Sequence, residues 1–118
     1  MASHLKTGNE GETLAAAYFT EMGYQLLHRN WRCGKSEIDI IASRSGTIHF
    51  IEVKTRTSFV FGYPEEKADK KKLKNMIDGS VEFLRQNPQW KKVQFDVLAI
   101  NLDETSSPKF FLIEDVYL

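Results

Sequence analysis

The sequence predicts an α/β fold in which a mixed β-sheet is flanked by α-helices. Helical and strand-like patterns follow one another in the order helix, hairpin, helix, strand, strand. Hydrophobic residues make up 42% and charged residues 27% of the 118 residues, close to the globular average. We therefore expect a single domain over residues 1–118 with one modest core.

The first helix is expected to begin near Asn9, because Asn9 and Glu12 have the spacing of a capping box. Thr7 and Glu10 offer a second register of the same motif. Gly23 is expected to end the helix. Between these limits apolar residues recur at helical spacing, namely Leu14, Ala15, Tyr18, Phe19 and Met22.

The next segments predict a β-hairpin. Residues 24–27 are apolar and indicate a short strand or its approach, whereas the polar segment 28–36 is interpreted as a loop. Residues 37–42 and 47–56 are rich in β-branched and aromatic side chains, which favours two strands. Residues 43–46 contain a glycine and two serines and predict the turn between them.

A long helix and two further strands complete the chain. An aromatic-rich loop is expected over 57–63, and Pro64 suits the first position of a helix that ends before Pro88. Strands are expected over 93–100 and 110–116. The predicted buried stripe of the helix consists of Leu73, Met76, Ile77, Ser80, Val81 and Leu84.

Composition excludes several classes of protein. Sixteen basic and sixteen acidic residues cancel, so a wholly basic, histone-like binder is excluded and any contact with nucleic acid must come from a local patch. A lone Cys33 excludes an intramolecular disulfide and a four-cysteine zinc site, and favours a cytoplasmic setting. The N-terminal residues lack the apolar region of a secretory signal, and no membrane partner is expected.

Charged residues interrupt the two strands of the predicted hairpin. Residues two apart on a strand share a face, so Glu52 and Lys54 point the same way. A two-residue turn at Ser45 and Gly46 would place Asp39 directly opposite Glu52. A loop of odd length without a bulge would separate the two acids instead.

This arrangement of charges predicts a metal site. Two neighbouring carboxylates repel each other, and a divalent cation such as Mg²⁺ or Mn²⁺ removes the conflict. We expect Asp39 and Glu52 to bind the metal, with the main-chain carbonyl of Val53 as a further ligand. Lys54 beside the metal would orient a water or stabilise charge on a phosphate, which phosphodiester hydrolysis requires.

The alternative is a solvated sheet face that carries surface ion pairs. Glu52 with Lys54, and Glu37 with Lys35, would then each contribute only ~0–1 kcal/mol. Apolar residues on both sides of Asp39 and Glu52 favour the metal site, because a charge within such strands needs a partner.

Glu12, Asp96 and the three histidines are further candidates for the site. Glu12 faces the same edge as the strand acids if the helix packs on the sheet. Alternatively, its side chain serves only to cap the helix. Asp96 lies in an apolar strand and is expected to be a hydrogen-bonded structural acid, or alternatively a support for the site. The three histidines lack ligand spacing, and His49 is expected on the face opposite Glu52.

The pattern of Asp39, then Glu52-Val53-Lys54, after a helix with Glu12 resembles the PD-(D/E)xK nuclease superfamily, which includes restriction endonucleases and Holliday junction resolvases. More closely, the chain resembles the YraN-like family of predicted endonucleases. The matching segments cover nearly the whole chain in the right order: residues 8–19, 23–24, 29–32, 37–42, 50–56, 61–62 and 95–100.

The resemblance implies a restriction endonuclease-like core, a mixed β-sheet flanked by α-helices. It also implies that Asp39 and Glu52 bind the metal, that Lys54 is the catalytic lysine and that Glu12 is an accessory acid. Glu37 matches the family pattern without a clear role. Ser36 departs from the pattern, because a glycine usually precedes that glutamate.

Two basic segments are candidates for contacts with DNA phosphates. In the first, 29–35, Trp31 would stack on an unpaired base, or alternatively belong to the core or a lid. The second is a stripe on the long helix, with a solvated helix face as the alternative. The stripe consists of Lys67, Lys70, Lys71 and Lys74, and Lys72 lies nearer the site. The predicted nucleic-acid contacts are Arg29, Arg32, Lys35, Arg56, Lys70 and Lys72.

We expect a Mg²⁺- or Mn²⁺-dependent endonuclease that hydrolyses DNA phosphodiester bonds. The expected substrate is DNA, including branched or single-strand-containing forms, and the small size favours a homodimer. The alternative is a catalytically weak or inactive nucleic-acid-binding module of the same fold. A third hypothesis is a protein-interaction domain that binds through Phe59, Phe61 and Tyr63.

Overall fold

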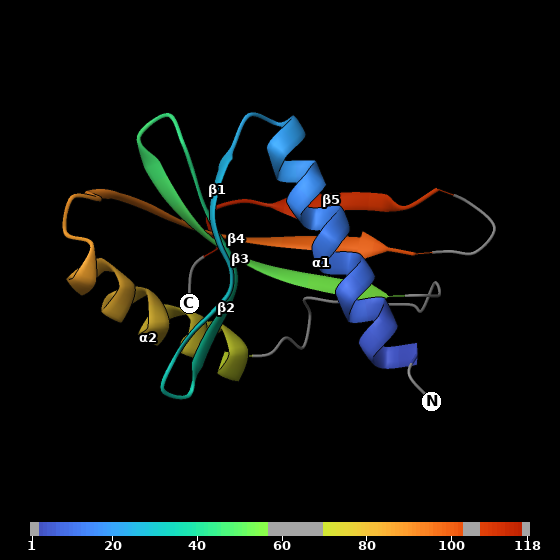
Figure 1. Ribbon diagram of the computed structural model, residues 1–118, viewed down its shortest axis with the longest axis horizontal. Helices are drawn as coiled ribbons and strands as arrows, with labels where there is room; N and C mark the ends of the chain where they lie inside the picture. The colour runs from blue at the N-terminus through green and yellow to red at the C-terminus, as the bar shows by residue number, and fades with distance from the viewer. Residues whose placement is uncertain (1–2, 57–69, 103–106, 117–118) are drawn as a thin grey trace.

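The part of the chain that the structure describes contains five strands in one mixed sheet and two helices (Figure 1). This computed structural model describes residues 3–56, 70–102 and 107–116, with side chains from residue 10 onward in the first helix. The strands lie in the order β1-β2-β3-β4-β5, and β3 and β4 run parallel while the other neighbours run antiparallel. The expected α/β fold is therefore confirmed, and it is consistent with a restriction endonuclease-like core. The elements are α1 (Ser3–Glu21), β1 (Gln25–Cys33), β2 (Ser36–Arg44), β3 (Thr47–Arg56), α2 (Lys70–Gln86), β4 (Lys92–Asn101) and β5 (Lys109–Ile113).

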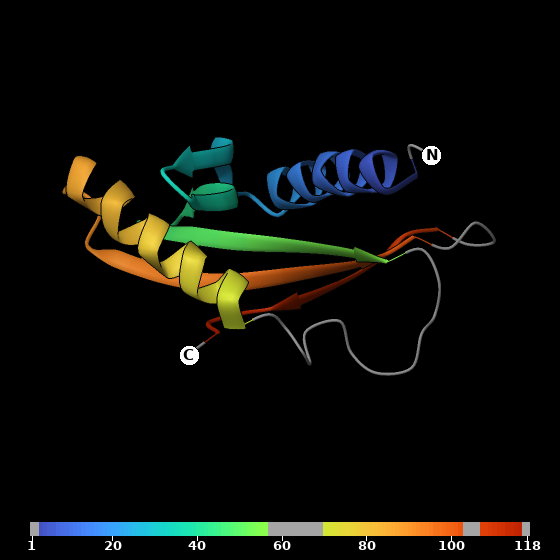
Figure 2. The same ribbon diagram turned by 90° about the horizontal axis from the view of Figure 1, so that it is seen from below.

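The two helices cover opposite faces of the sheet. Phe19 of α1 packs in a cluster with Ile51, whereas Phe83 of α2 packs with Phe50, the preceding residue of the same strand. Successive side chains of a strand point to opposite faces, so α1 and α2 each bury a separate half of the core. Figures 1 and 2 show the helices displaced toward opposite ends of the sheet. Among the described helices, none is long and apolar enough to cross a membrane.

The strands β3 and β4 form the longest pairing of the sheet. Their register runs from Thr47 opposite Lys92 to Arg56 opposite Asn101. Parallel strands need a crossover connection, and α2 lies within it. The expected strand over 93–100 is confirmed. The last strand is shorter than expected, since β5 ends at Ile113. Beyond it, the N–H of Val116 donates to the carbonyl of Phe95.

The expected loop over 28–36 is wrong, because most of it belongs to a second hairpin. β1 pairs with β2 as far as Cys33 opposite Ser36, with a register shift between Leu26 and His28. Gly34 has a φ of 61°, which a tight two-residue turn needs and glycine adopts without strain. β1 lies at an edge of the sheet and is mostly exposed, so its sequence lacks the apolar alternation by which strands are recognised.

The expected start of α1 is also wrong. The helix begins at Ser3, so both expected starts, near Asn9 and near Thr7, lie within it. The Glu12 carboxylate instead accepts a hydrogen bond from Asn30 of β1. The predicted end is confirmed, since Gly23 follows the helix with a φ of 91°.

The buried face of α2 is rotated relative to the predicted stripe. Met76 and Ser80 are buried as expected, but Val81 is 62% exposed, so its assignment to the stripe was wrong. Gly79 and Phe83 are buried instead. A Cβ atom on Gly79 would lie only 3.1 Å from the Cβ of Ser36, so this glycine lets α2 approach the hairpin closely. The predicted helix start at Pro64, the aromatic segment 57–63 and Lys67 lie outside the described residues.

Candidate functional site

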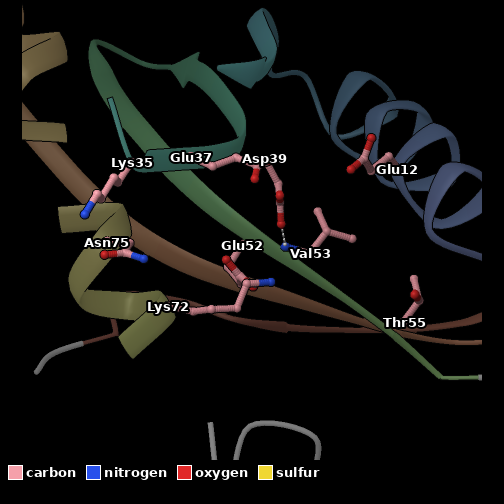
Figure 3. A pocket seen from close by; sticks show the side chains of 9 residues that line it. All are labelled: Glu12, Lys35, Glu37, Asp39, Glu52, Val53, Thr55, Lys72 and Asn75. Atoms are coloured by element: carbon pink, nitrogen blue, oxygen red, sulfur yellow. Dashed lines mark hydrogen bonds and ion pairs between the residues drawn. The ribbon is translucent and has the colours of Figure 1, made fainter. Parts of the chain in front are cut away.

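A pocket of about 350 Å³ lies where α1, α2, β2 and β3 meet (Figure 3). Glu12 approaches it from α1, and Lys72 and Asn75 approach it from α2 on the other side. Four of the lining side chains are acidic and two are basic. The lining residues are Glu12, Lys35, Glu37, Asp39, Glu52, Val53, Thr55, Lys72 and Asn75.

The pocket opens at the point where β2 separates from β3. The two strands are paired from Ile40 opposite Ile51 to Arg44 opposite Thr47, with the expected two-residue turn between them. Continued by one residue, this register sets Asp39 opposite Glu52. There the ladder gives way to a side-chain contact, in which the backbone N–H of Val53 donates to Oδ2 of Asp39 over 2.8 Å.

β2 also rotates about its axis at Asp39. In a regular strand Ile38 and Ile40 would share a face. Instead Ile40 packs in the apolar cluster beneath α1, and Ile38 packs in the cluster beneath α2. This rotation carries the outer end of the hairpin away from β3 and leaves Asp39 at the wall of the pocket.

Glu52 is the most deeply buried acid of the pocket. It is 3% exposed and lies on the α2 face of β3, next to the apolar Phe50 cluster. The Lys72 ammonium lies 2.7 Å from the Oε2 atom of Glu52, and the Lys72 side chain is 59% exposed. Among the described residues this oxygen has no partner with hydrogen-bond geometry, so the ion pair with Lys72 supplies its compensation.

Asp39 is electrostatically unfavourable in its charged form. Burial, followed by the negative charge of Glu52 and more weakly that of Glu12, raises the pKa of Asp39 to about 7. The hydrogen bond from Val53 and the positive charge of Lys72 oppose this rise without cancelling it. The pocket is therefore short of positive charge, and a bound cation would relieve the repulsion.

Glu12 reaches the pocket because α1 lies unusually close to β3. A Cβ atom on Gly11 would come within 2.0 Å of Cγ2 and 3.2 Å of Cβ of Thr55. Only glycine allows this approach without movement of Thr55. Glu12 itself is fixed by Asn30, whose Nδ2 atom donates to Oε1 over 2.9 Å.

The predicted lysine is less well placed than the predicted acids. Lys54 shares the strand face of Glu52 and is half-buried, but it is not among the described residues that line the pocket. Lys72 contacts Glu52 instead. Thus Glu12, Asp39 and Glu52 come together in one pocket, with Lys54 two residues along the strand.

Two of the six predicted DNA-contact residues line the pocket, namely Lys35 and Lys72. Arg32 lies outside the lining, near the end of β1. Its side chain is 72% exposed and lies 3.5 Å from the Glu37 carboxylate. The remaining three lie outside the lining. They are Arg29 on β1, Arg56 at the end of β3 and Lys70 at the start of the described part of α2.

Sequence reasoning missed Thr55, Asn75 and Asn30. Asn75 follows Lys72 by three residues on α2, so the helical spacing that placed Lys72 near the site also contained the signal for Asn75. Thr55 faces the α1 side of β3, where it contacts α1 at Gly11. Asn30 was hidden by the interpretation of its segment as a loop.

The donor groups of the pocket fit a hard divalent cation. Within the described ranges, no three His, Cys, Asp or Glu side chains cluster closely enough to form a metal cage made of protein alone. Mg²⁺ commonly takes only one or two carboxylates and completes its shell with water and a substrate phosphate. Asp39 and Glu52 meet that requirement, and the Lys72 ammonium already places a cationic group against Glu52.

Comparison with known sequences shows the family. Residues 11–100 match the profile described as Uncharacterised protein family UPF0102. The chain belongs to this family. The resemblance to the YraN-like family is thereby confirmed at the level of the family, and the matched UPF0102 segment contains every acid of the pocket.

Curated UPF0102 relatives span almost the same length. A UPF0102 protein of Chloroherpeton thalassium is 38% identical over 99% of this chain and 97% of its own length. One from Phocaeicola vulgatus is 41% identical over 89% of this chain and 87% of its own. One from Chlorobaculum parvum is 45% identical over 84% of this chain and 80% of its own.

This UPF0102 chain has a second buried polar group away from the pocket. His49 Nδ1 and Asp96 Oδ2 share a hydrogen bond of 2.8 Å, and Asp96 Oδ1 accepts from Gln94 and from the backbone N–H of Asp115. Burial alone would raise the pKa of Asp96, but these hydrogen bonds outweigh it and the pKa is lowered. The expected structural role of Asp96 is confirmed, and His49 faces away from Glu52 as expected.

Proposed function

We propose that this protein is a metal-dependent endonuclease of the PD-(D/E)xK superfamily that hydrolyses phosphodiester bonds of DNA. The observation that carries the proposal is the convergence of Asp39 and Glu52, from two strands, in one pocket where Glu52 is buried and Asp39 is partly buried. An arrangement that disfavours its own charge is typical of a site built for a ligand rather than for stability. Mg²⁺ or Mn²⁺ is the cofactor that these ligands suit.

Each residue of the pocket has a role in this proposal. Asp39 and Glu52 would hold the metal, and the metal when bound would lower the pKa of a water and polarise the scissile phosphate. The hydrogen bond from Val53 fixes the Asp39 carboxylate, so one of its oxygens keeps a constant direction. Glu12 would be the accessory acid, accepting a hydrogen bond from a water held in the pocket that it lines. Lys54, with the neighbouring Lys72, offsets negative charge on the phosphate in the transition state.

The basic residues around the pocket support DNA as the substrate. Lys35 and Arg32 lie at the outer end of the β1–β2 hairpin, and Lys70 and Lys72 lie on α2 across the pocket. A phosphate backbone entering between them would meet positive charge on two sides. Positive charge so limited in extent suits a short DNA contact at a branch or a single-stranded segment, with a homodimer as the way to extend it.

A catalytically weak DNA-binding module of the same fold is the second candidate. Two observations favour it: Lys54 does not line the pocket, and Lys72 occupies the face of Glu52. Such a module would bind metal and DNA without cleavage.

A cleavage assay separates the two functions. The purified chain is incubated with Mg²⁺ or Mn²⁺ and with linear duplex, single-stranded and four-way branched DNA, and products are resolved on denaturing gels. We expect metal-dependent cleavage of at least the branched form, and its loss in D39N, E52Q and K54M. The matched controls D78N and E82Q remove charges from positions of α2 that do not line the pocket, and they should cut as the unmodified chain does.

The same samples discriminate among the outcomes. Cleavage retained in a purified E52Q protein would contradict the assignment of the site. Binding of Mn²⁺ and DNA without cleavage of any form would select the binding module. Absence of both Mn²⁺ binding and salt-dependent DNA affinity would exclude both functions.

A further inference from the structure

Asn30 has a backbone conformation that few residues adopt. It lies within β1 and has a φ of 52°, in the left-handed region. That region is unfavourable for most L-residues by roughly 1–2 kcal/mol, and asparagine is among the few that tolerate it. The described neighbours Arg29 and Trp31 are regular ladder residues, paired with Ile40 and Ile38. The unusual conformation is thus confined to one position of the strand.

That position lies directly across the hairpin from a site acid. Because Arg29 pairs with Ile40 and Trp31 with Ile38, the residue opposite Asn30 is Asp39. Asp39 is also where β2 rotates and leaves β3. A residue in the left-handed region departs from the extended backbone of a regular strand. The irregular backbone at Asn30 therefore lies directly opposite the residue at which β2 rotates and the pocket opens.

The side chain of Asn30 is connected to a second site acid. Its amide Nδ2 donates to Oε1 of Glu12 over 2.9 Å and so joins β1 to α1. An amide donor satisfies one carboxylate oxygen and leaves the other available to a ligand in the pocket that Glu12 lines. Asn30, which does not line the pocket, thus contacts Glu12 through its side chain and lies opposite Asp39 through its backbone.

We infer that Asn30 is a positioning residue of the metal site, acting through Glu12 with its side chain and through Asp39 with its backbone. The inference rests on the proposed function, because it assigns Asn30 a part in binding the divalent cation. Outer residues that orient metal ligands commonly change metal affinity by about 10- to 100-fold when they are replaced.

Two substitutions separate the two contributions. N30G keeps the left-handed conformation and removes only the amide, so we expect Mn²⁺ affinity to fall about tenfold. N30V removes the amide and also disfavours the left-handed conformation, so we expect a larger loss, up to about 100-fold. S45G is the matched control, because Ser45 also has a positive φ of 54° but lies in the turn away from the pocket. Mn²⁺ affinity is measured by titration calorimetry, and the free energy of unfolding is measured in urea for every variant.

A double-mutant cycle with E12A tests the route of the effect. If Asn30 acts through Glu12, N30G should weaken Mn²⁺ binding in the unmodified background and have no further effect in the E12A background. An equal loss in both backgrounds, or no loss in N30G, would overturn the inference. So would a loss of the same size in S45G. N30G keeps the test valid should N30V fail to fold.

The cycle also distinguishes failure of this inference from failure of the proposed function. If the unmodified chain binds Mn²⁺ and N30G binds it equally well, Asn30 has no positioning role and the metal site stands. If the unmodified chain binds no Mn²⁺, the metal site is wrong and the positioning role is wrong with it.

Discussion

The Lys72 ammonium lies 2.7 Å from Oε2 of Glu52, a carboxylate that is otherwise buried. The lysine comes from α2 and the glutamate from the central part of β3, so the pair spans the pocket wall. Lys72 therefore neutralises the same carboxylate charge that a bound divalent cation would neutralise.

Replacement of Lys72 should weaken the metal-free fold and strengthen metal binding. In K72M the buried Glu52 loses its cation, so we expect the free energy of unfolding with chelator present to fall by about 1–2 kcal/mol. The expected loss is below that of a fully buried pair because the Lys72 side chain is 59% exposed. Urea unfolding with EDTA measures the first effect, and calorimetric titration with Mn²⁺ measures the second. K71M, on the exposed neighbour, is the control; weaker Mn²⁺ binding in K72M than in K71M would contradict competition between Lys72 and the metal.

Asp39→Asn should separate stability from metal binding. The amide oxygen still accepts the hydrogen bond from Val53, while the repulsion from Glu52 disappears. We expect the metal-free D39N protein to be as stable as the unmodified chain or more stable, by about 1 kcal/mol. Excess Mn²⁺ should raise the unfolding free energy of the unmodified chain, by about 2.7 kcal/mol at one hundred times its Kd, and should leave D39N unchanged. Equal stabilisation of both proteins by Mn²⁺ would place the metal elsewhere.

Gly11→Ala should disturb the contact between α1 and β3. Alanine in place of glycine within a helix ordinarily raises the free energy of unfolding by about 0.5–1 kcal/mol. A lower free energy of unfolding in G11A would therefore reflect the clash with Thr55. We expect a net loss of about 1–3 kcal/mol in the free energy of unfolding, because neither the helix nor the strand backbone moves freely. T55A removes the nearest methyl group, and the double variant G11A/T55A should recover part of the loss. No recovery would show that the loss has another cause.

Asp96 should make the fold sensitive to acid. Its folded-state pKa is below the unfolded value of about 3.9, so the folded protein binds fewer protons at that carboxyl. Its contribution to stability is therefore complete above about pH 4 and is lost as the pH falls through the folded-state pKa. D96N should lower the free energy of unfolding at neutral pH by about 1–3 kcal/mol and lose less on acidification. Urea unfolding curves recorded from about pH 6 down to about pH 3 compare the two proteins, and parallel curves would contradict the assignment.

Much of the site geometry followed from strand periodicity. The turn residues Ser45 and Gly46 set the register of β2 and β3, and that register brought Asp39 and Glu52 to one pocket. The apolar neighbours of the two acids were a valid sign of burial. The central strands were predictable because both of their faces are buried and their sequences are accordingly apolar.

Other features could not be predicted, for identifiable physical reasons. β1 is an exposed edge strand whose polar sequence has no periodic signal, so its hairpin was interpreted as a loop. Val81 is exposed because the buried face of α2 includes Gly79 and Phe83 instead, and the close packing that Gly79 allows is a tertiary contact that helical spacing alone does not contain. The roles of Asn30 and Lys72 depend on contacts between elements distant in the chain.

The long parallel pairing of β3 and β4 has a consequence for truncated and nascent chains. A fragment that ends at Gln86 would contain all of the acids and lysines assigned to the site, yet β3 would lack the neighbour that holds it along its whole length. The residues assigned to the site therefore lie in the first three quarters of the protein. The complete pairing of β3 with β4 requires that the chain be synthesised as far as residue 101.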